Sequence, residues 1–219
     1  MKTITVRGQG SYAAKPDYVE LTLVLEARAT DYDEAMAAAA VQLEQIDSSL
    51  QSAGFAKGSA KTTVFNVRTE YENVKDEGDT WQNVFKGYLI YHNLSVGFGF
   101  DTALLAKTLT ALSSSEAKPS LTIEFTLQNA EEAKNRLLED ISANALRKAR
   151  ILCSASGVRL GSLQSINYSW EDSRPVSRSE FSLADSMAPR MMKAAIEFSP
   201  DDIQLTDNAT FVWEIVEVS

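Results

Sequence analysis

The sequence predicts an α+β protein in which an antiparallel or mixed sheet carries helices packed on one of its faces. Three observations lead to this prediction: segments that alternate apolar and polar residues, capped amphipathic segments between them, and the absence of regular strand–helix–strand alternation. A strand–strand–helix unit occurs twice in the first part of the chain. With 219 residues, 44% of them hydrophobic, we expect a single domain over residues 1–219.

The strands are predicted from residues that alternate between two faces. Ile4 and Val6 mark the first, and Phe211 and Trp213 mark the last. Lys15, Pro16 and Asp17 form a plausible turn after the first strand. The acidic stretch 72–79 is expected to be an exposed loop. We expect strands near residues 3–10, 19–26, 63–71, 88–98, 121–127, 166–170 and 209–215.

Three helices are predicted from capping residues and helical spacing. Asp31 begins the first, which ends at Gly54, and Asp101 begins a shorter one. Asn129 begins the longest, which ends at Gly157. Its expected buried face consists of Ala133, Leu137, Ile141, Ala145, Ala149 and Leu152.

The net charge of the chain and its N-terminal sequence restrict the binding partners and the cellular location that we expect. A net charge of −9 repels nucleic acid phosphates and anionic lipid, so we expect no nucleic acid partner. No stretch has the length and apolarity of a membrane span. The N-terminus lacks the apolar core of a secretory signal, which predicts a cytoplasmic protein. A periplasmic or extracellular location would require that a leader had been removed.

Few residues suggest chemistry. His92 and Cys153 are the only histidine and cysteine, so neither a Ser–His–Asp relay nor a zinc site of several His and Cys ligands is expected. We interpret His92 as structural and Cys153 as a buried or inert thiol. The run from Gly8 to Ala13 has the spacing of a nucleotide-binding loop, but a strand follows it rather than a helix. No catalytic residue, metal or cofactor is predicted.

Several short motifs, in order along nearly the whole chain, resemble the SIMPL (DUF541) family. They are Ile4-Thr5-Val6-Arg7-Gly8-Gln9-Gly10, Pro16-Asp17, Gly87-Tyr88, and the helical Ala145, Arg147, Lys148 and Ala149 followed by Gly157 and Leu160-Gly161. The resemblance implies no established catalytic residues. It implies an oligomeric bacterial protein associated with stress or the cell envelope. The motif residues expected to be architectural are Gly8, Gly10, Pro16, Asp17, Gly87 and Gly157.

The resulting hypothesis is a non-enzymatic, homo-oligomeric scaffold or interaction protein. It follows from the resemblance and from the lack of convergent catalytic groups. Two alternatives stay open: a small-ligand or carbohydrate binder that uses exposed aromatic residues, and an enzyme whose site the sequence does not reveal.

A segment at 171–193 is longer than the usual connections within a domain. Its positive and negative charges balance, and it carries more apolar residues than a solvated loop needs. We expect it to dock on a neighbouring subunit; the alternatives are a flexible loop and a loop folded on its own domain. The expected contact residues are Phe181, Leu183, Met187, Met191 and Met192.

Overall fold

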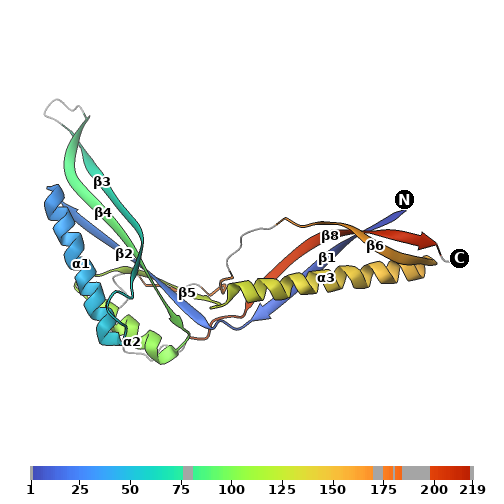
Figure 1. Ribbon diagram of the computed structural model, residues 1–219. Coiled ribbons are helices and arrows are strands. Elements are labelled where there is room, and N and C mark those ends of the chain that lie inside the picture. Colours follow the sequence, from blue (N-terminus) through green and yellow to red (C-terminus); the bar gives the residue numbers. More distant parts are fainter. Residues whose placement is uncertain (1, 76–80, 170–174, 180, 184–197, 218–219) are drawn as a thin grey trace. The chain divides into compact units, whose positions relative to one another are not determined.

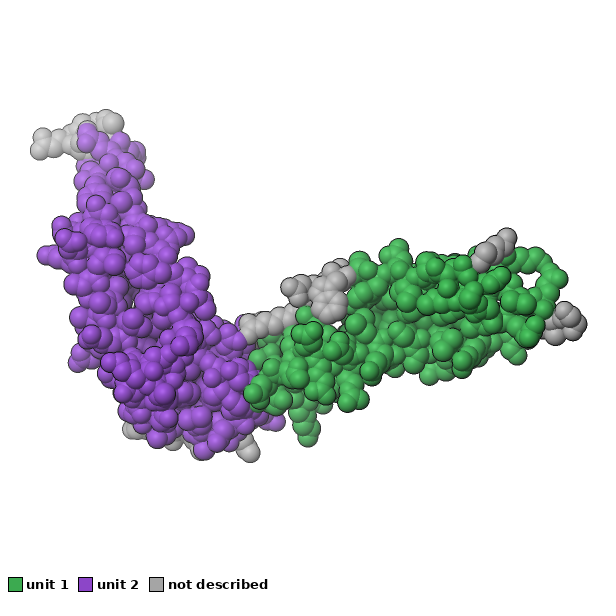
Figure 2. All heavy atoms as spheres, viewed as in Figure 1, with its two compact units in different colours: residues 1–17, 126–178, 200–219 green, residues 18–125, 179–199 purple. Residues whose placement is uncertain are grey.

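The computed structural model describes residues 2–75, 81–169, 175–179, 181–183 and 198–217 (Figure 1). The chain divides into two compact units, and neither is continuous in sequence (Figure 2). Unit 1 comprises residues 1–17, 126–178 and 200–219, and unit 2 comprises residues 18–125 and 179–199. Each unit contains a sheet with helical packing on one face, which confirms the α+β class.

Unit 1 is a three-stranded sheet covered by one long helix. Its strands β1 (Thr3–Ala14), β8 (Ile203–Glu217) and β6 (Val158–Asn167) lie in the order β1-β8-β6, and both pairings are antiparallel. The register places Val6 opposite Phe211 and Gly10 opposite Asp207. Helix α3 (Ala130–Ala155) packs on this sheet.

Helix α3 buries every fourth residue. Side chains four positions apart lie on one face of a helix, so this row forms one continuous apolar stripe. The row continues from Ala149 to Cys153, which is buried as a free thiol, whereas Leu152 is 50% exposed. The expectation that Leu152 belongs to the buried face was therefore wrong. The buried row is Ala133, Leu137, Ile141, Ala145, Ala149 and Cys153.

Helix α3 lies directly against the backbone of β1 at two glycines. A Cβ atom on Gly10 would lie 2.7 Å from Ile141 Cγ1 and 2.9 Å from Ile141 N. A Cβ atom on Gly8 would collide with the carbonyl oxygen of Ile141 and lie 2.8 Å from Ala145 Cβ. The absence of side chains at these two positions therefore sets the distance between helix and strand.

Unit 2 has a five-stranded sheet with two helices on one face. Along the chain its elements are β2 (Tyr18–Ala29), α1 (Tyr32–Ala53), β3 (Lys61–Lys75), β4 (Trp81–Gly99), α2 (Thr102–Ser113), β5 (Ser120–Thr126) and β7 (Phe181–Leu183). The strand order is β3-β4-β2-β5-β7, and β4 is antiparallel to both β2 and β3. The core joins β2 residues such as Leu21 and Leu23 to Ile46 and Leu50 of α1 and Leu105 of α2.

The helix ends agree with the sequence signals. The Asp31 side chain accepts hydrogen bonds from the N–H groups of Asp33 and Glu34, and Asp101 does the same for α2. Helix α1 ends at Gly54, whose φ of 113° lies in the left-handed region.

The first two strands do not form a pair with each other. β1 pairs with β8 and β2 pairs with β4, so the link around Pro16 connects two different sheets. Asp17 holds this link, because its Oδ1 accepts from the N–H of Gln128 at 2.7 Å and its own N–H donates to the Thr126 carbonyl at 3.2 Å. Several strands are longer than predicted. β1 continues to Ala14, immediately before the expected turn at Lys15, and β6 begins at Val158, three residues after the last residue of α3.

We predict that Gly10→Val lowers the free energy of unfolding by about 1–3 kcal/mol or more, because α3 must move away from β1. Gly99→Val is a matched control, since nothing lies within 4 Å of the position of its Cβ. That change should alter stability by no more than about 0.5 kcal/mol. Urea unfolding of both variants provides the measurement. Equal stability of Gly10→Val and wild type would show that the close approach is not required.

Candidate functional site

No group of three or more His, Cys, Asp or Glu side chains suited to a metal occurs among the described residues. Within the same residues, none of the helices has both the length and the apolar character needed to cross a bilayer. Three other features merit a close description: the outer edge of β1, the environment of His92, and the far part of the β3–β4 pair.

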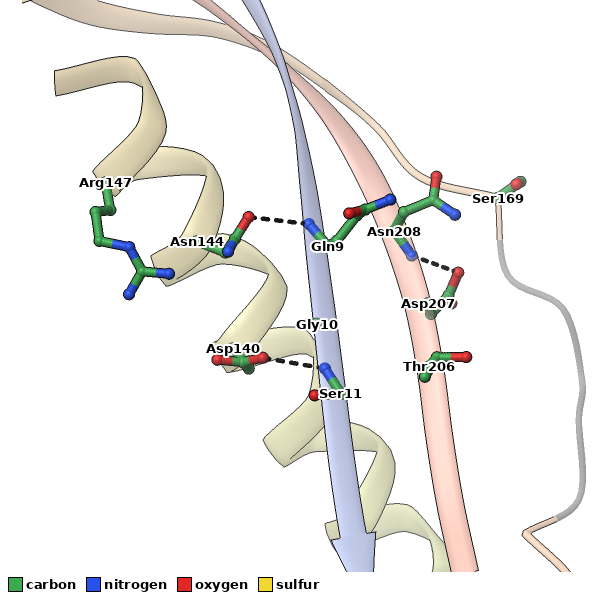
Figure 3. A pocket seen from close by; sticks show the side chains of 10 residues that line it. All are labelled: Gln9, Gly10, Ser11, Asp140, Asn144, Arg147, Ser169, Thr206, Asp207 and Asn208. Atoms are coloured by element: carbon green, nitrogen blue, oxygen red, sulfur yellow. Dashed lines mark hydrogen bonds between the residues drawn. The ribbon is translucent and has the colours of Figure 1, made fainter. Parts of the chain in front are cut away.

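Side chains of α3 bind the outer edge of β1. Alternate residues of an antiparallel strand direct their backbone groups away from the paired strand, and Arg7, Gln9 and Ser11 do so here. Asn144 Oδ1 accepts from the Gln9 N–H at 3.2 Å (Figure 3). Asp140 Oδ2 accepts from the Ser11 N–H at 3.1 Å, and Lys148 Nζ donates to the Arg7 carbonyl at 3.2 Å.

The side chains of α3 stay aligned with β1 because the helix and the strand advance by similar lengths per repeat. Four helical residues advance about 6 Å, and two strand residues advance about 6.8 Å. Asp140, Asn144 and Lys148 therefore follow β1 in the opposite chain direction without losing register. A strand edge with its backbone groups bonded in this way is closed to another strand. Asp140 therefore has a structural role at this edge.

A polar hollow of about 700 Å³ lies beside this edge (Figure 3). It contains two carboxylates, Asp140 and Asp207, and one guanidinium, that of Arg147. Asp207 Oδ2 accepts from the hydroxyl of Tyr168 at 2.9 Å. Burial, and secondly the bond to Asp207, raises the pKa of Tyr168. The other lining residues are Gln9, Gly10, Ser11, Asn144, Ser169, Thr206 and Asn208.

His92 is buried in unit 2, as the sequence suggested for a structural histidine. Its Nε2 forms a hydrogen bond with Thr62 Oγ1 at 2.8 Å, and its ring packs edge-on against Phe65 with centroids 5.1 Å apart. Its Nδ1 atom is buried and has no hydrogen-bond partner among the described residues. Burial lowers the pKa of His92 below its ordinary value of 6.5, because the site disfavours a charged imidazole.

The far part of β3 and β4 is a two-stranded ribbon, which we define as residues 70–75 and 81–87. β2 pairs with β4 only from Tyr88 onward, so within the described sheet the ribbon residues of β4 pair with β3 alone. The strands run past the end of α1 (Figure 1). Trp81 is 64% exposed and Tyr71 is 55% exposed. The other exposed large apolar side chains of β3 and β4 are Val64, Phe65, Val74, Val84 and Phe85.

Aromatic rings connect the ribbon to the body of unit 2. Tyr71 contacts Phe85, Phe85 contacts Tyr88, and Tyr88 contacts Tyr32 at the start of α1, all edge-to-face with centroids 5.4–5.8 Å apart. The sequence did not identify this ribbon, because residues 72–79 were predicted to form a loop. The aromatic residues at 71, 81 and 85 on either side of that stretch were the available signal.

The predicted motif residues are distributed over both units. Gly87 has a φ of 152° and packs against the Ala29 carbonyl, and Gly157, which follows the C-cap of α3, has a φ of 70°. Phe181 and Leu183 belong to β7, which pairs with β5 of the same chain. Met187, Met191 and Met192 lie outside the described residues, as does Trp170. Docking of segment 171–193 on a neighbouring subunit thus stays a prediction.

The fold defines an α+β protein built from two sheet-and-helix units, with a bare aromatic ribbon and a polar hollow as its distinctive surfaces. The chain belongs to the SIMPL family, described as protein of unknown function (DUF541), which matches residues 4–213. This confirms the resemblance found in the sequence.

Two relatives are similar over most of their length. The 26 kDa periplasmic immunogenic protein of Brucella melitensis biotype 1 is 26% identical over 191 residues, which are 85% of this chain and 75% of the relative. The protein of the same name from Brucella abortus strain S19 is 25% identical over the same shares. Both names state a periplasmic location, so the comparison gives no support to the expected cytoplasmic one.

We predict that wild-type protein loses stability as the pH falls below about 6.5. The unfolded chain gains a proton on His92 near that pH, whereas the folded chain gains it only at a lower pH. For one titrating group, the free energy of unfolding can fall by at most about 1.4 kcal/mol per pH unit. His92→Gln should reduce the difference in urea stability between pH 7.5 and 5.5. Equal losses in both proteins would contradict the assignment to His92.

Proposed function

We propose that this protein is a non-enzymatic scaffold that associates with copies of itself through the ribbon of β3 and β4. The observation that carries the proposal is the exposure of Tyr71, Trp81 and Phe85 on a ribbon that none of the described helices covers along its far part. Contiguous exposed apolar surface of this kind is typical of protein interaction sites. Membership of the SIMPL family is consistent with this role but assigns no activity.

The proposal does not depend on the cellular compartment. Cys153 is the only cysteine and is buried, so the fold requires no intrachain disulfide. The names of the two Brucella relatives favour a periplasmic location for this chain as well.

Light scattering of the purified protein tests the scaffold. We expect a mass that is a multiple of the 24.0 kDa chain, and a lower mass after Tyr71→Ser, Trp81→Ser and Phe85→Ser are combined. A matched control replaces Ile151 and Leu152 with Ser, since these are also exposed apolar residues but lie on α3. A monomeric wild type would refute the proposal, as would an unchanged mass of the folded triple variant.

A second candidate function is the binding of a small polyhydroxylated ligand such as a sugar. The polar hollow of unit 1 favours it, because carboxylate, guanidinium and amide groups all line one space. Asp207 and Arg147 come from different elements, β8 and α3, and supply opposite charges.

Saturation-transfer NMR with glucose and with N-acetylglucosamine tests the hollow. We expect wild type to give a binding signal. Arg147→Ala should weaken the affinity for the sugar roughly tenfold, which is the effect of losing one hydrogen bond to a charged group. Arg150→Ala is the control, since Arg150 lies on α3 but does not line the hollow. No signal, or equal weakening by both variants, would exclude the hollow as a site for these sugars.

A further inference from the structure

The outer edges of the two sheets differ in how their backbone groups are bonded. The edge of β1 is bonded by Asp140, Asn144 and Lys148 of α3. β3 is terminal in its sheet, so among the described strands only β4 pairs with it. It is 15 residues long and contains no proline. A long strand with one unpaired edge and two exposed faces is a template for a further strand.

We propose that the outer edge of β3 pairs antiparallel with β3 of a second copy, about a two-fold axis through Thr69. This inference rests on the proposed self-association and names the surface that produces it. The two copies would form one continuous sheet, and the contact would be isologous, each copy supplying the same residues.

The charges of β3 select this register. A two-fold axis perpendicular to the sheet keeps each side chain on its own face of the sheet. Two residues that face each other across the contact must therefore both have odd numbers or both have even numbers. With the axis at Thr69, Arg68 faces Glu70 of the second copy, and the reverse pair forms by symmetry. An axis at Arg68 would place two arginines opposite each other, and one at Glu70 or Glu72 would place two glutamates opposite each other.

The apolar residues agree with the same register. Val67 would face Tyr71 of the second copy, and Val64 would face Val74. β3 carries three basic and two acidic residues, so its charges do not prevent pairing as a run of like charges would.

The exposed aromatic surface amounts to about half of what a standard dimer interface buries per partner. Phe65, Tyr71, Trp81 and Phe85 are 45–64% exposed. With about 150–250 Å² for a whole aromatic side chain, they leave on the order of 400 Å² in water per copy. A standard interface buries about 800 Å² per partner, and the valines and the strand backbone contribute further area.

A cysteine placed on the proposed axis tests the register directly. Paired antiparallel residues have Cα atoms about 4.5–5.5 Å apart, within the range of a disulfide. In a Cys153→Ala background, we expect Thr69→Cys to form a covalent dimer under mild oxidation, in most of the protein. Val64→Cys is the matched control, because its two copies would lie roughly 34 Å apart along the strands.

A charge reversal gives a second measurement that does not depend on oxidation. Arg68→Glu places like charges opposite each other at two positions, so we expect a lower mass in light scattering. Arg159→Glu makes the same change on β6 and should leave the mass unchanged. An oligomeric protein in which Thr69→Cys fails to cross-link, or links no better than Val64→Cys, would overturn this register while leaving the scaffold proposal intact. A monomeric wild type would overturn both.

Discussion

The contact between α3 and β1 is the constraint on which unit 1 depends. Gly8 and Gly10 let the helix lie on the strand backbone, and Ile141 occupies the space that their side chains would fill. The same approach brings Asp140 and Asn144 within hydrogen-bond distance of the strand edge. One line of contact therefore buries the apolar row of α3 and satisfies the outer backbone groups of β1.

This contact explains why the two units differ in their surfaces. In unit 1 helix α3 covers the sheet and its polar side chains also bond the outer edge of β1. The polar hollow beside that edge is lined in part by side chains that already have structural partners, such as Asp207, which accepts from Tyr168. In unit 2 the helices cover the face of the sheet, and the ribbon of β3 and β4 extends past α1, where β4 is the sole partner of β3 among the described strands. The association that we propose is therefore assigned to unit 2.

Aromatic contacts allow the ribbon to keep its form without a helix above it. A two-stranded ribbon is only marginally stable by itself in water. The ring series from Tyr71 through Phe85 and Tyr88 to Tyr32 ties it to the start of α1. Nearer the core, burial of His92 against Phe65 and its bond to Thr62 fix the inner end of β3.

The sequence by itself determined the types of the elements, because they depend on local patterns. Alternation defined β2 and the inner part of β4, and Asp31, Asp101 and Asn129 marked the helix starts that the structure contains. These signals act over a few residues, so a single chain displays them. The sequence also identified the motif glycines, but it did not show the close approach of α3 to β1 that requires Gly8 and Gly10.

Only the tertiary structure decided which strands pair and which surfaces stay bare. β1 pairs with β8, about 200 residues away, because α3 and β8 bury Val6 together, and no local pattern encodes such a partner. Cys153 rather than Leu152 is buried because it continues the four-residue row of α3 that faces the sheet, a choice that helical spacing alone leaves open. The ribbon was missed for the same reason: residues 72–75 become strand through pairing with β4, against their polar composition.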